Sequence, residues 1–179
     1  MFRKLLNSEL GRPDLEEFRK IKKNPVTVVL DNIRSQHNIG SAFRTCDAFL
    51  IEKICLCGIC ATPPSPEIHK SALGAEESVQ WQFYEDTADA VRQLKEQGYT
   101  IISVEQTENS TSLENFIPDS SLRYAVIFGN EVKGVRQDIV DMSDLCLEIP
   151  QSGTKHSLNV SVATGIVLWT FAGFIFRKQ

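Results

Sequence analysis

The chain has 179 residues, of which 42% are hydrophobic and 23% are charged, and its net charge at pH 7 is −4. This length suits one domain with a sizeable core, and the composition excludes collagen-like, low-complexity and disordered chains. The acidic balance counts against a strongly basic nucleic-acid binder, because phosphate binding usually leaves a basic footprint. A local basic patch is still compatible with it, and the basic residues inside loops are Arg34, Arg44, Lys133, Arg136 and Lys155.

Residues 1–24 predict a short helical extension in front of the main domain, residues 25–179. A helix start at Pro13-Asp14 and a break at Asn24-Pro25 bound its last helix. After the break, the apolar patterns predict four elements. They are a buried strand at Val26–Leu30, a polar loop at Asp31–Gly40, a helix at Ser41–Phe49 and a second strand at Lys53–Ile59.

Three of the five cysteines, Cys55, Cys57 and Cys60, cluster in and directly after the second predicted strand. An odd number of cysteines without a secretory leader predicts reduced thiols in a cytoplasmic protein. A zinc site is the alternative, but no second Cys/His pair stands at a usual ligand spacing, so no metal is expected. Cys55 and Cys57 alternate with apolar residues, as is typical of one face of a strand.

The middle of the chain continues the alternation of strands and helices after a proline-rich connection, Ala61–Pro66. Apolar residues at helical spacing predict an amphipathic helix that Gly98 ends. The predicted elements are a strand at Val79–Tyr84, this helix at Asp86–Gln97, a further strand at Tyr99–Val104 and a helical turn at Leu113–Ile117.

The last third of the chain predicts five elements. They are a strand at Tyr124–Phe128, a helix at Arg136–Met142, a strand at Leu145–Ile149, a loop at Pro150–His156 and a long uncharged helix at Ser157–Phe176. The uncharged stretch is long enough to span a bilayer. Its polar residues and glycines favour a helix that is buried in the protein or in a dimer interface, so no membrane partner is expected. A C-terminal membrane anchor is the alternative.

This order of elements predicts an α/β fold with a largely parallel sheet. In such sheets ligands bind beyond the carboxyl ends of the strands, where three polar loops follow predicted strands. In the first loop, Asn38 and Gly40 suit a tight strand-to-helix turn. Arg44 lies one helical turn further on, where its guanidinium can hold an RNA phosphate with two hydrogen bonds. The alternative is a surface ion pair.

The second loop, Phe128–Val135, has two glycines directly after a strand, which indicates close approach of the backbone to a ligand. It is not a Walker motif, because no Gly-Lys-Ser/Thr follows. Glu131 would repel a phosphate, so a cofactor with a positive centre suits it better. The alternative is a glycine turn with a capping side chain.

The third loop leads from Ile149 to a helix N-terminus, where backbone N–H groups are free to bind a ligand. Ser157 is the simple candidate for the helix cap. A cap at Ser157 leaves Asn159 without an explanation, because burial of an unpaired amide is costly.

Taken together and in this order, the three loops resemble the signature motifs of the TrmH (SpoU) family of the SPOUT superfamily of RNA methyltransferases. Residues 38–45 match N-x-G-x-x-x-R-T, residues 128–134 match F-G-x-E-x-x-G, and residues 149–163 match I-P…S-L-N-V-S-V-A. The resemblance runs from about Val26 to about Ala172.

The resemblance implies a fold and an assembly that the strand pattern alone does not predict. It implies the SPOUT α/β fold with a parallel sheet and a C-terminal deep trefoil knot, although true knots are almost absent from proteins. It also implies a homodimer that binds S-adenosyl-L-methionine in the knot, near the subunit interface. The reaction would transfer the methyl group of this cofactor to a ribose 2′-hydroxyl of RNA, with tRNA as the first candidate and rRNA as the second.

The resemblance also implies site roles, residue by residue. The implied catalytic residues are Arg44, Glu131, Ser157 and Asn159. The implied contacts to the adenosine part of the cofactor are Val104, Gly129, Ile149 and Leu158. No metal is required, because the sulfonium is already a good leaving group. An arginine is nearly always protonated, so electrostatic stabilisation is the simpler role for Arg44, and a role as base stays open.

Two other classes of protein stay open. The first is a catalytically silent RNA-binding relative, although a binding module need not keep Arg44, Glu131 and Asn159 together. The second is a generic α/β enzyme that acts on small molecules and whose loops only imitate the motifs. Such an enzyme would lack the C-terminal knot.

Overall fold

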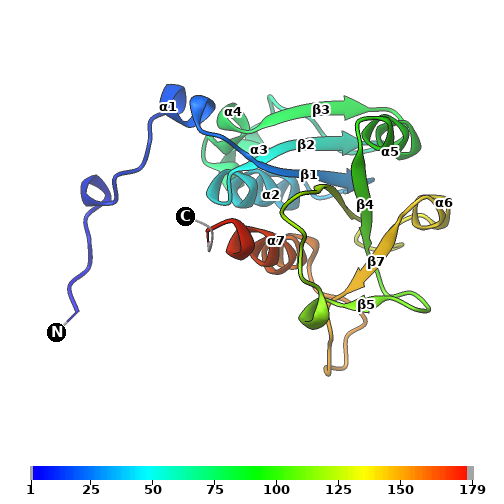
Figure 1. The fold of residues 1–179 in the computed structure, drawn as a ribbon. Helices are drawn as coiled ribbons and strands as arrows, with labels where there is room; N and C mark the ends of the chain where they lie inside the picture. Colours follow the sequence, from blue (N-terminus) through cyan, green and yellow to red (C-terminus); the bar gives the residue numbers. More distant parts are fainter. Residues whose placement is uncertain (1, 177–179) are drawn as a thin grey trace.

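The computed structural model describes residues 2–176, and for residues 173–176 it describes the backbone only. Its centre is a seven-stranded sheet in the order β3-β2-β1-β6-β4-β7-β5, with every neighbouring pair parallel (Figure 1). The strands are β1 Asn24–Asp31, β2 Ile51–Cys57, β3 Gln80–Tyr84, β4 Tyr99–Val104, β5 Thr111–Ser112, β6 Arg123–Phe128 and β7 Leu145–Glu148. The predicted α/β class with a parallel sheet is confirmed.

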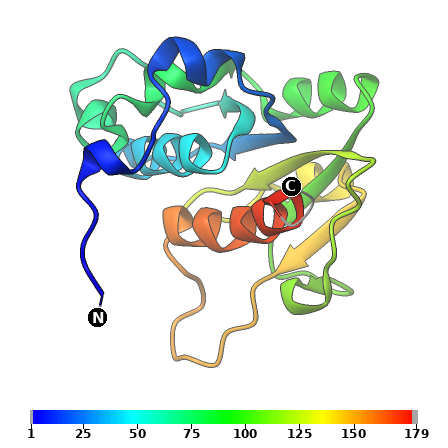
Figure 2. The same ribbon diagram turned by 60° about the vertical axis from the view of Figure 1, so that its left-hand side comes forward.

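Helices cover both faces of the sheet (Figures 1 and 2). One face is covered by α2 Gln36–Ala48, α3 Pro66–Ala72, α4 Ala75–Ser78 and α7 Val160–Phe176. The other face is covered by α5 Thr87–Glu96 and α6 Gln137–Asp141. The short elements are η1 Asn7–Glu9, α1 Leu15–Lys20 and η2 Leu113–Asn115.

Two hydrophobic cores lie on the two faces because successive strand residues point in opposite directions. In β1, Val28 and Leu30 enter the core under α2 and α7, whereas Val29 enters the core under α5. Phe43 of α2 and Leu94 of α5 are fully buried, one in each core. A central strand that is apolar on both faces is expected for a parallel sheet between two helical layers.

The cysteine cluster is divided between these two cores. Cys55 and Cys57 are buried on the α5 side, whereas Cys60 is buried on the opposite side. There the Cys60 thiol donates to the Leu30 carbonyl at 3.3 Å. Burial raises the pKa of Cys55 and of Cys60 to about 11, which favours thiols over metal-binding thiolates. Among residues 2–176 no group of three or more His, Cys, Asp or Glu side chains suits a metal ion.

Helix α2 begins five residues earlier than predicted, so the prediction of a loop up to Gly40 is wrong. Ser35 caps the helix by accepting the N–H of Asn38 at 3.3 Å. Gly40 therefore lies inside the helix rather than in a turn. A Cβ at Gly40 would come within 2.3 Å of the Ile68 carbonyl oxygen, so this glycine allows α2 and α3 to pack closely.

Several other predicted boundaries differ from the structure. Helices α3 and α4 were not predicted, because the segment from 66 to 78 is short and follows a proline-rich stretch. The break predicted at Asn24-Pro25 is instead the start of β1. The Asn24 N–H donates to the Leu50 carbonyl at 2.7 Å, and the β1–β2 register shifts between Asn24 and Thr27, which accommodates the proline.

Helix α7 begins at Val160, after a cap that is Asn159 rather than Ser157. The Asn159 side chain accepts the N–H of Ser161 at 2.8 Å, which is the geometry of an N-cap. Asn159 is exposed, so the cost of a buried, unpaired amide does not arise. No helix among the described residues is long and apolar enough to cross a membrane.

Candidate cofactor and substrate site

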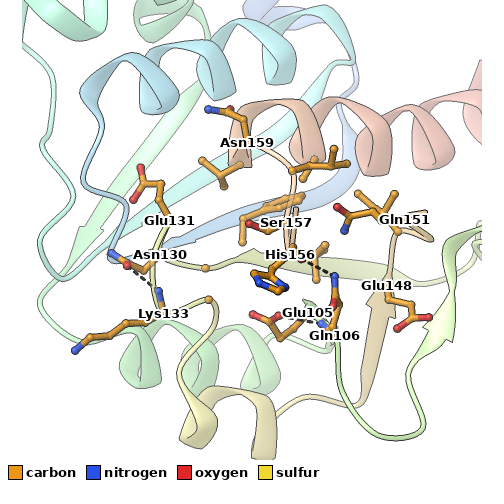
Figure 3. A pocket seen from close by; sticks show the side chains of 18 of the residues that line it. Glu105, Gln106, Asn130, Glu131, Lys133, Glu148, Gln151, His156, Ser157 and Asn159 are labelled. Carbon is orange, nitrogen blue, oxygen red and sulfur yellow. Dashed lines mark hydrogen bonds between the residues drawn. The ribbon is translucent and has the colours of Figure 1, made fainter. Parts of the chain in front are cut away.

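A cavity of about 560 Å³ opens at the carboxyl ends of three neighbouring strands, β6, β4 and β7. Its walls are the first residues after β4, the β6–α6 loop, the end of β7 with the following loop, and the first turn of α7 (Figure 3). The volume is in the usual range for small-molecule and cofactor sites. Seven of the eight predicted site residues line it, namely Val104, Gly129, Glu131, Ile149, Ser157, Leu158 and Asn159.

Glu131 joins the second predicted motif to the first. One carboxylate oxygen accepts the Arg34 N–H at 3.0 Å, and the other accepts the Ser35 N–H at 3.1 Å. The second oxygen also accepts from the Asn38 side-chain amide at 3.1 Å. Partial burial alone would raise the pKa of Glu131, but these donors to its carboxylate lower it overall. Glu131 is therefore ionised and fixes the start of α2 beside the cavity.

Asn38 extends this connection to the third motif. Its side-chain oxygen accepts from the Asn159 amide at 3.2 Å, while its own amide donates to Glu131. The sequence had pointed to Asn38 as a turn residue and as the first residue of a motif, without a role in the site. In the structure it links all three predicted motifs, because its two polar atoms contact one residue from each of the other two.

The β6–α6 loop is a tight turn whose shape depends on glycine. The backbones of Asn130 and Gly134 exchange two hydrogen bonds, at 3.0 and 2.9 Å. A Cβ at Gly129 would come within 2.1 Å of the carbonyl carbon of Gly134 and of the Val135 nitrogen, so no side chain fits there. The cavity wall at Gly129 is therefore bare backbone, which a ligand can approach closely.

Arg44 is the one predicted site residue outside the cavity lining. It lies in α2 with its side chain exposed, and it makes no hydrogen bond or ion pair to the described part of the chain. Helix α2 is nevertheless fixed relative to the cavity by the contacts of Asn38 with Glu131 and Asn159. Arg44 is thus a free guanidinium on an anchored helix.

The charged side chains that line the cavity are mostly acidic. Three carboxylates line it, those of Glu105, Glu131 and Glu148. One lysine, Lys133, also lines it, but its side chain points away from the cavity in Figure 3. Opposite charges attract over the few ångströms of such a site, so this lining favours a ligand with a positive centre. Glu105 and Gln106 were missed by sequence reasoning, although two polar residues directly after a buried strand were a usable signal.

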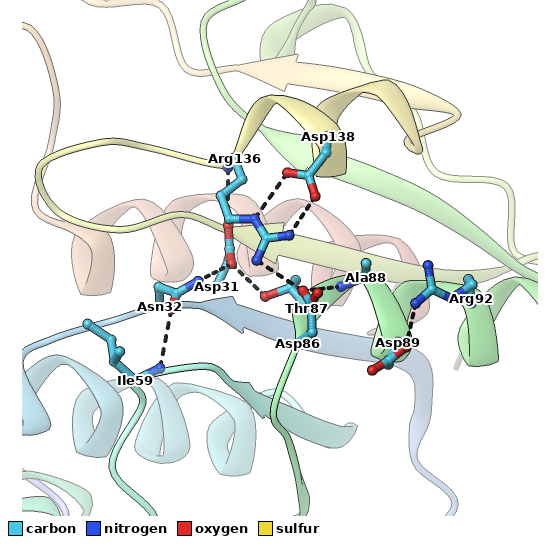
Figure 4. Close-up of polar contacts among 10 residues, drawn as sticks. All are labelled: Asp31, Asn32, Ile59, Asp86, Thr87, Ala88, Asp89, Arg92, Arg136 and Asp138. Atoms are coloured by element: carbon cyan, nitrogen blue, oxygen red, sulfur yellow. Dashed lines mark hydrogen bonds and ion pairs between the residues drawn. The ribbon is translucent and has the colours of Figure 1, made fainter.

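A second polar cluster supports the site from below the β6–α6 loop (Figure 4). The buried carboxylate of Asp31, at the end of β1, accepts from the Thr87 hydroxyl at 2.5 Å and from the Arg136 N–H at 3.2 Å. The Arg136 guanidinium pairs in turn with Asp86 at 3.0 Å and with Asp138. These contacts join β1 to the first turns of α5 and α6, and so fix the far end of the loop.

The chain matches the model of the SpoU rRNA Methylase family over residues 25–169. It is 30% identical to the tRNA (guanosine(18)-2′-O)-methyltransferase of Thermus thermophilus over 162 residues, which are 90% of this chain and 81% of that protein. It is 32% identical to the 23S rRNA (guanosine-2′-O-)-methyltransferase RlmB of Neisseria meningitidis over 148 residues, 83% of this chain and 58% of that protein.

Solved structures share the fold. The A. aeolicus TrmH/SpoU tRNA modifying enzyme superposes with a TM-score of 0.80 at 25% identity, over 92% of this chain and 83% of that one. The AdoMet-bound rRNA methyltransferase of Sinorhizobium meliloti superposes with a TM-score of 0.78 at 26% identity, over 86% of this chain and 59% of that one.

Proposed function

The chain belongs to the SpoU rRNA methylase family and is an S-adenosylmethionine-dependent RNA ribose 2′-O-methyltransferase, and we propose that its substrate is a tRNA. The enzyme works as a cytoplasmic homodimer, and its C-terminal part forms a deep trefoil knot. Residues 25–179 form the methyltransferase domain behind a short extension, residues 1–24. One observation carries the placement of the methyltransferase site: the cavity gathers seven predicted site residues from separate loops at the carboxyl edge of the sheet.

The cavity fits the cofactor in size, charge and wall structure. S-adenosylmethionine supplies a methyl group on a positively charged sulfur that is a good leaving group. The acidic lining suits this charge, and the bare backbone at Gly129 suits close contact with the adenosine. In the proposed arrangement, backbone groups of Val104, Gly129, Ile149 and Leu158 hold the adenosine part.

Replacement of Gly129 by alanine tests this wall of the site. The new methyl group would come within 2.1 Å of backbone atoms of Gly134 and Val135, so the loop must move. Overpacking of this kind costs about 1–3 kcal/mol, so we expect a roughly 5- to 150-fold weaker S-adenosylmethionine affinity by calorimetry. Gly153→Ala is the matched control, because a Cβ at Gly153 meets nothing within 4 Å. Equal affinities of the two variants would contradict the assignment.

In the proposed reaction, the ribose 2′-oxygen attacks the methyl carbon in line with the bond to sulfur. The O–C bond forms as the C–S bond breaks, and the hydroxyl proton leaves to solvent. Arg44, free and exposed, holds an RNA phosphate and stabilises negative charge on the attacking oxygen while it stays protonated. Glu131 and Asn159 act through Asn38, because their contacts fix the helix that carries Arg44.

An RNA partner is compatible with the acidic chain because three basic residues without a partner in the described part of the chain lie in the loops beside the cavity. Arg34, Lys133 and Lys155 come from the three motif loops, and their side chains make no hydrogen bond or ion pair to the described residues. Arg136, by contrast, is engaged by Asp86 and Asp138. Local cations without protein partners are available to phosphates.

Methyl transfer from labelled S-adenosylmethionine to separated tRNA and rRNA that lack the modification tests the proposed function. We expect label in tRNA, mapped to a 2′-O-methyl nucleotide. Label in rRNA alone would replace the proposed substrate. No transfer to either RNA by an enzyme that binds the cofactor would favour a silent relative.

The homodimer is supported by an apolar stripe on α7 that stays exposed in the described chain. Val162, Ile166 and Trp169 are spaced by one helical turn each and are exposed by 50%, 39% and 63%. Ile166→Glu should convert the dimer to a monomer in sedimentation velocity, because a buried, unpaired carboxylate is costly in an interface. Phe83→Glu on the distant edge strand β3 is the control and should stay dimeric. A dimeric Ile166→Glu variant would contradict this interface.

The knot is supported by the path of the chain after β7. Strand β7 lies between β4 and β5, whereas α7 returns to contact α2 and β1, on the other side of β6 and β4. The β7–α7 segment therefore crosses from one part of the sheet to the other, and it lines the cavity together with the loops that follow β4 and β6. In the proposed knot, the β7–α7 segment passes through these loops, and the segment and the loops together form the walls of the cavity.

A further inference from the structure

The dipeptide Glu105-Gln106 directly follows β4 and lies at the base of the cavity (Figure 3). It has no part in the motifs, and its two side chains hold different loops. The Glu105 N–H first extends the sheet by donating to the Leu147 carbonyl at 3.0 Å. This hydrogen bond fixes the backbone of the dipeptide to the sheet, and its two side chains extend from that fixed backbone to the loops.

The Glu105 side chain holds the β6–α6 loop. One carboxylate oxygen accepts the Val135 N–H at 2.9 Å, and the other accepts the Gln106 N–H at 2.9 Å. Gly134 has φ +69°, and a Cβ there would come within 2.1 Å of the carboxylate. The carboxylate therefore occupies the space that a side chain at Gly134 would need, so the two residues fit each other.

The Gln106 side chain holds the β7–α7 loop. Its amide donates to the His156 carbonyl at 3.0 Å. All residues from Gln151 to Leu158 are exposed, and within the described part of the chain this is the single hydrogen bond that joins them to the rest of the protein. Without it, these eight residues would have to become ordered when a ligand binds, which weakens affinity.

We propose that Glu105 and Gln106 are positioning residues that hold the two cofactor-binding loops at the separation S-adenosylmethionine requires. Both loops then meet the cofactor already formed, and neither side chain takes part in methyl transfer. This inference rests on the proposed function, because it assumes that the cavity holds this cofactor. It adds two residues from outside the motifs and a separate role for each.

The test of Gln106 combines cofactor affinity with the exposure of Lys155, which lies in the held loop next to His156. In Gln106→Ala, trypsin cleavage after Lys155 in the cofactor-free enzyme should become roughly two- to tenfold faster, as expected for loss of one hydrogen bond. The cleavage is followed by mass spectrometry of the fragment that begins at His156. The Kd and KM for S-adenosylmethionine should rise by the same factor, while kcat at saturating cofactor stays unchanged.

Two further variants separate positioning from a general loss of stability. Gln106→Glu has nearly the same shape but no donor, so it should behave like Gln106→Ala. Gln82→Ala on the edge strand β3 also removes an exposed glutamine and should match the wild type. Unchanged cleavage and affinity in both Gln106 variants, or a fall in kcat at saturating cofactor, would overturn the role of Gln106.

Glu105 is tested by a pair of substitutions. Glu105→Gln keeps an acceptor for the Val135 N–H and should retain cofactor affinity within about threefold, whereas Glu105→Ala removes the acceptor and should lose roughly two- to tenfold or more. Equal loss in both variants would mean that the charge of Glu105 alone accounts for its effect on affinity, and would overturn a positioning role through the contact with Val135. A wild-type enzyme that does not bind the cofactor would refute the proposed function. The cleavage assay needs no cofactor, so it would still show whether Gln106 holds the β7–α7 loop.

Discussion

Arg44→Ala is expected to lower kcat for RNA methylation by about 10²–10³-fold and to leave the affinity for S-adenosylmethionine nearly unchanged. The guanidinium lies outside the cavity lining, so its removal leaves the cofactor walls intact. The attacking oxygen loses the charge that stabilises it and the contact that positions its phosphate. Arg44→Lys should recover only part of the rate, because an ammonium cannot form the two parallel hydrogen bonds.

Single-turnover transfer of a labelled methyl group measures the rate, and calorimetry measures the affinity. Arg92→Ala is the matched control, because Arg92 is exposed on α5, on the opposite face of the sheet. A variant Arg44→Ala that loses cofactor affinity as much as rate would place this arginine in the cofactor site instead.

Asp31→Asn is expected to have the largest effect on stability, a loss of about 3 kcal/mol in the free energy of unfolding. Asp31 is fully buried, and its two oxygens accept from Thr87, Asn32 and Arg136. An asparagine has one oxygen, so its amide faces either the hydroxyl side or the Arg136 N–H. One buried donor then has no acceptor, which costs more than the loss of an exposed contact.

Thermal unfolding should show this as a fall in Tm of about 6–12 °C for a chain of this size. Asp141→Asn on the exposed side of α6 removes a carboxylate whose one hydrogen bond within the described residues is to Gln137, and should change Tm by no more than about 2 °C. A fall in Tm for Asp31→Asn no larger than that of this control would show that the polar cluster in Figure 4 does not contribute the predicted stability.

The buried strands were the part of the fold most accessible to sequence reasoning. Tyr99–Val104 was predicted with the bounds of β4, because a β-branched run buried on both faces leaves a strong pattern. The strand order was not accessible. β6 lies next to β1 although four strands separate them along the chain, and only contacts between distant segments decide this.

Helix α2 shows why a boundary was misjudged. Asn38 and Gly40 are poor helix formers, so local propensity predicted a loop up to Gly40. In the structure the glycine makes room for the Ile68 carbonyl of α3, and Asn38 binds two distant side chains. Tertiary contacts therefore outweigh propensity at both positions, and neither contact is visible from the neighbouring sequence.

The candidate site was predicted through the motifs rather than through the fold. Seven of the eight predicted site residues line one cavity, six of them from the motifs, and their roles stay predictions until they are tested. Glu105 and Gln106 were missed because their partners are backbone groups of Val135 and His156. A side chain that binds backbone atoms leaves no matching residue type elsewhere in the sequence.

The contacts of Asn38 give the two substrates a reason to affect each other. In the proposed site, a cofactor that orders Glu131 and Asn159 also orders the first turn of α2, and hence the helix that carries Arg44. Thermodynamic linkage then requires the effect to be mutual: the factor by which bound cofactor tightens RNA binding equals the factor by which bound RNA tightens cofactor binding. One asparagine side chain thus couples the two binding sites, so that each substrate binds more tightly beside the other, whichever of them binds first.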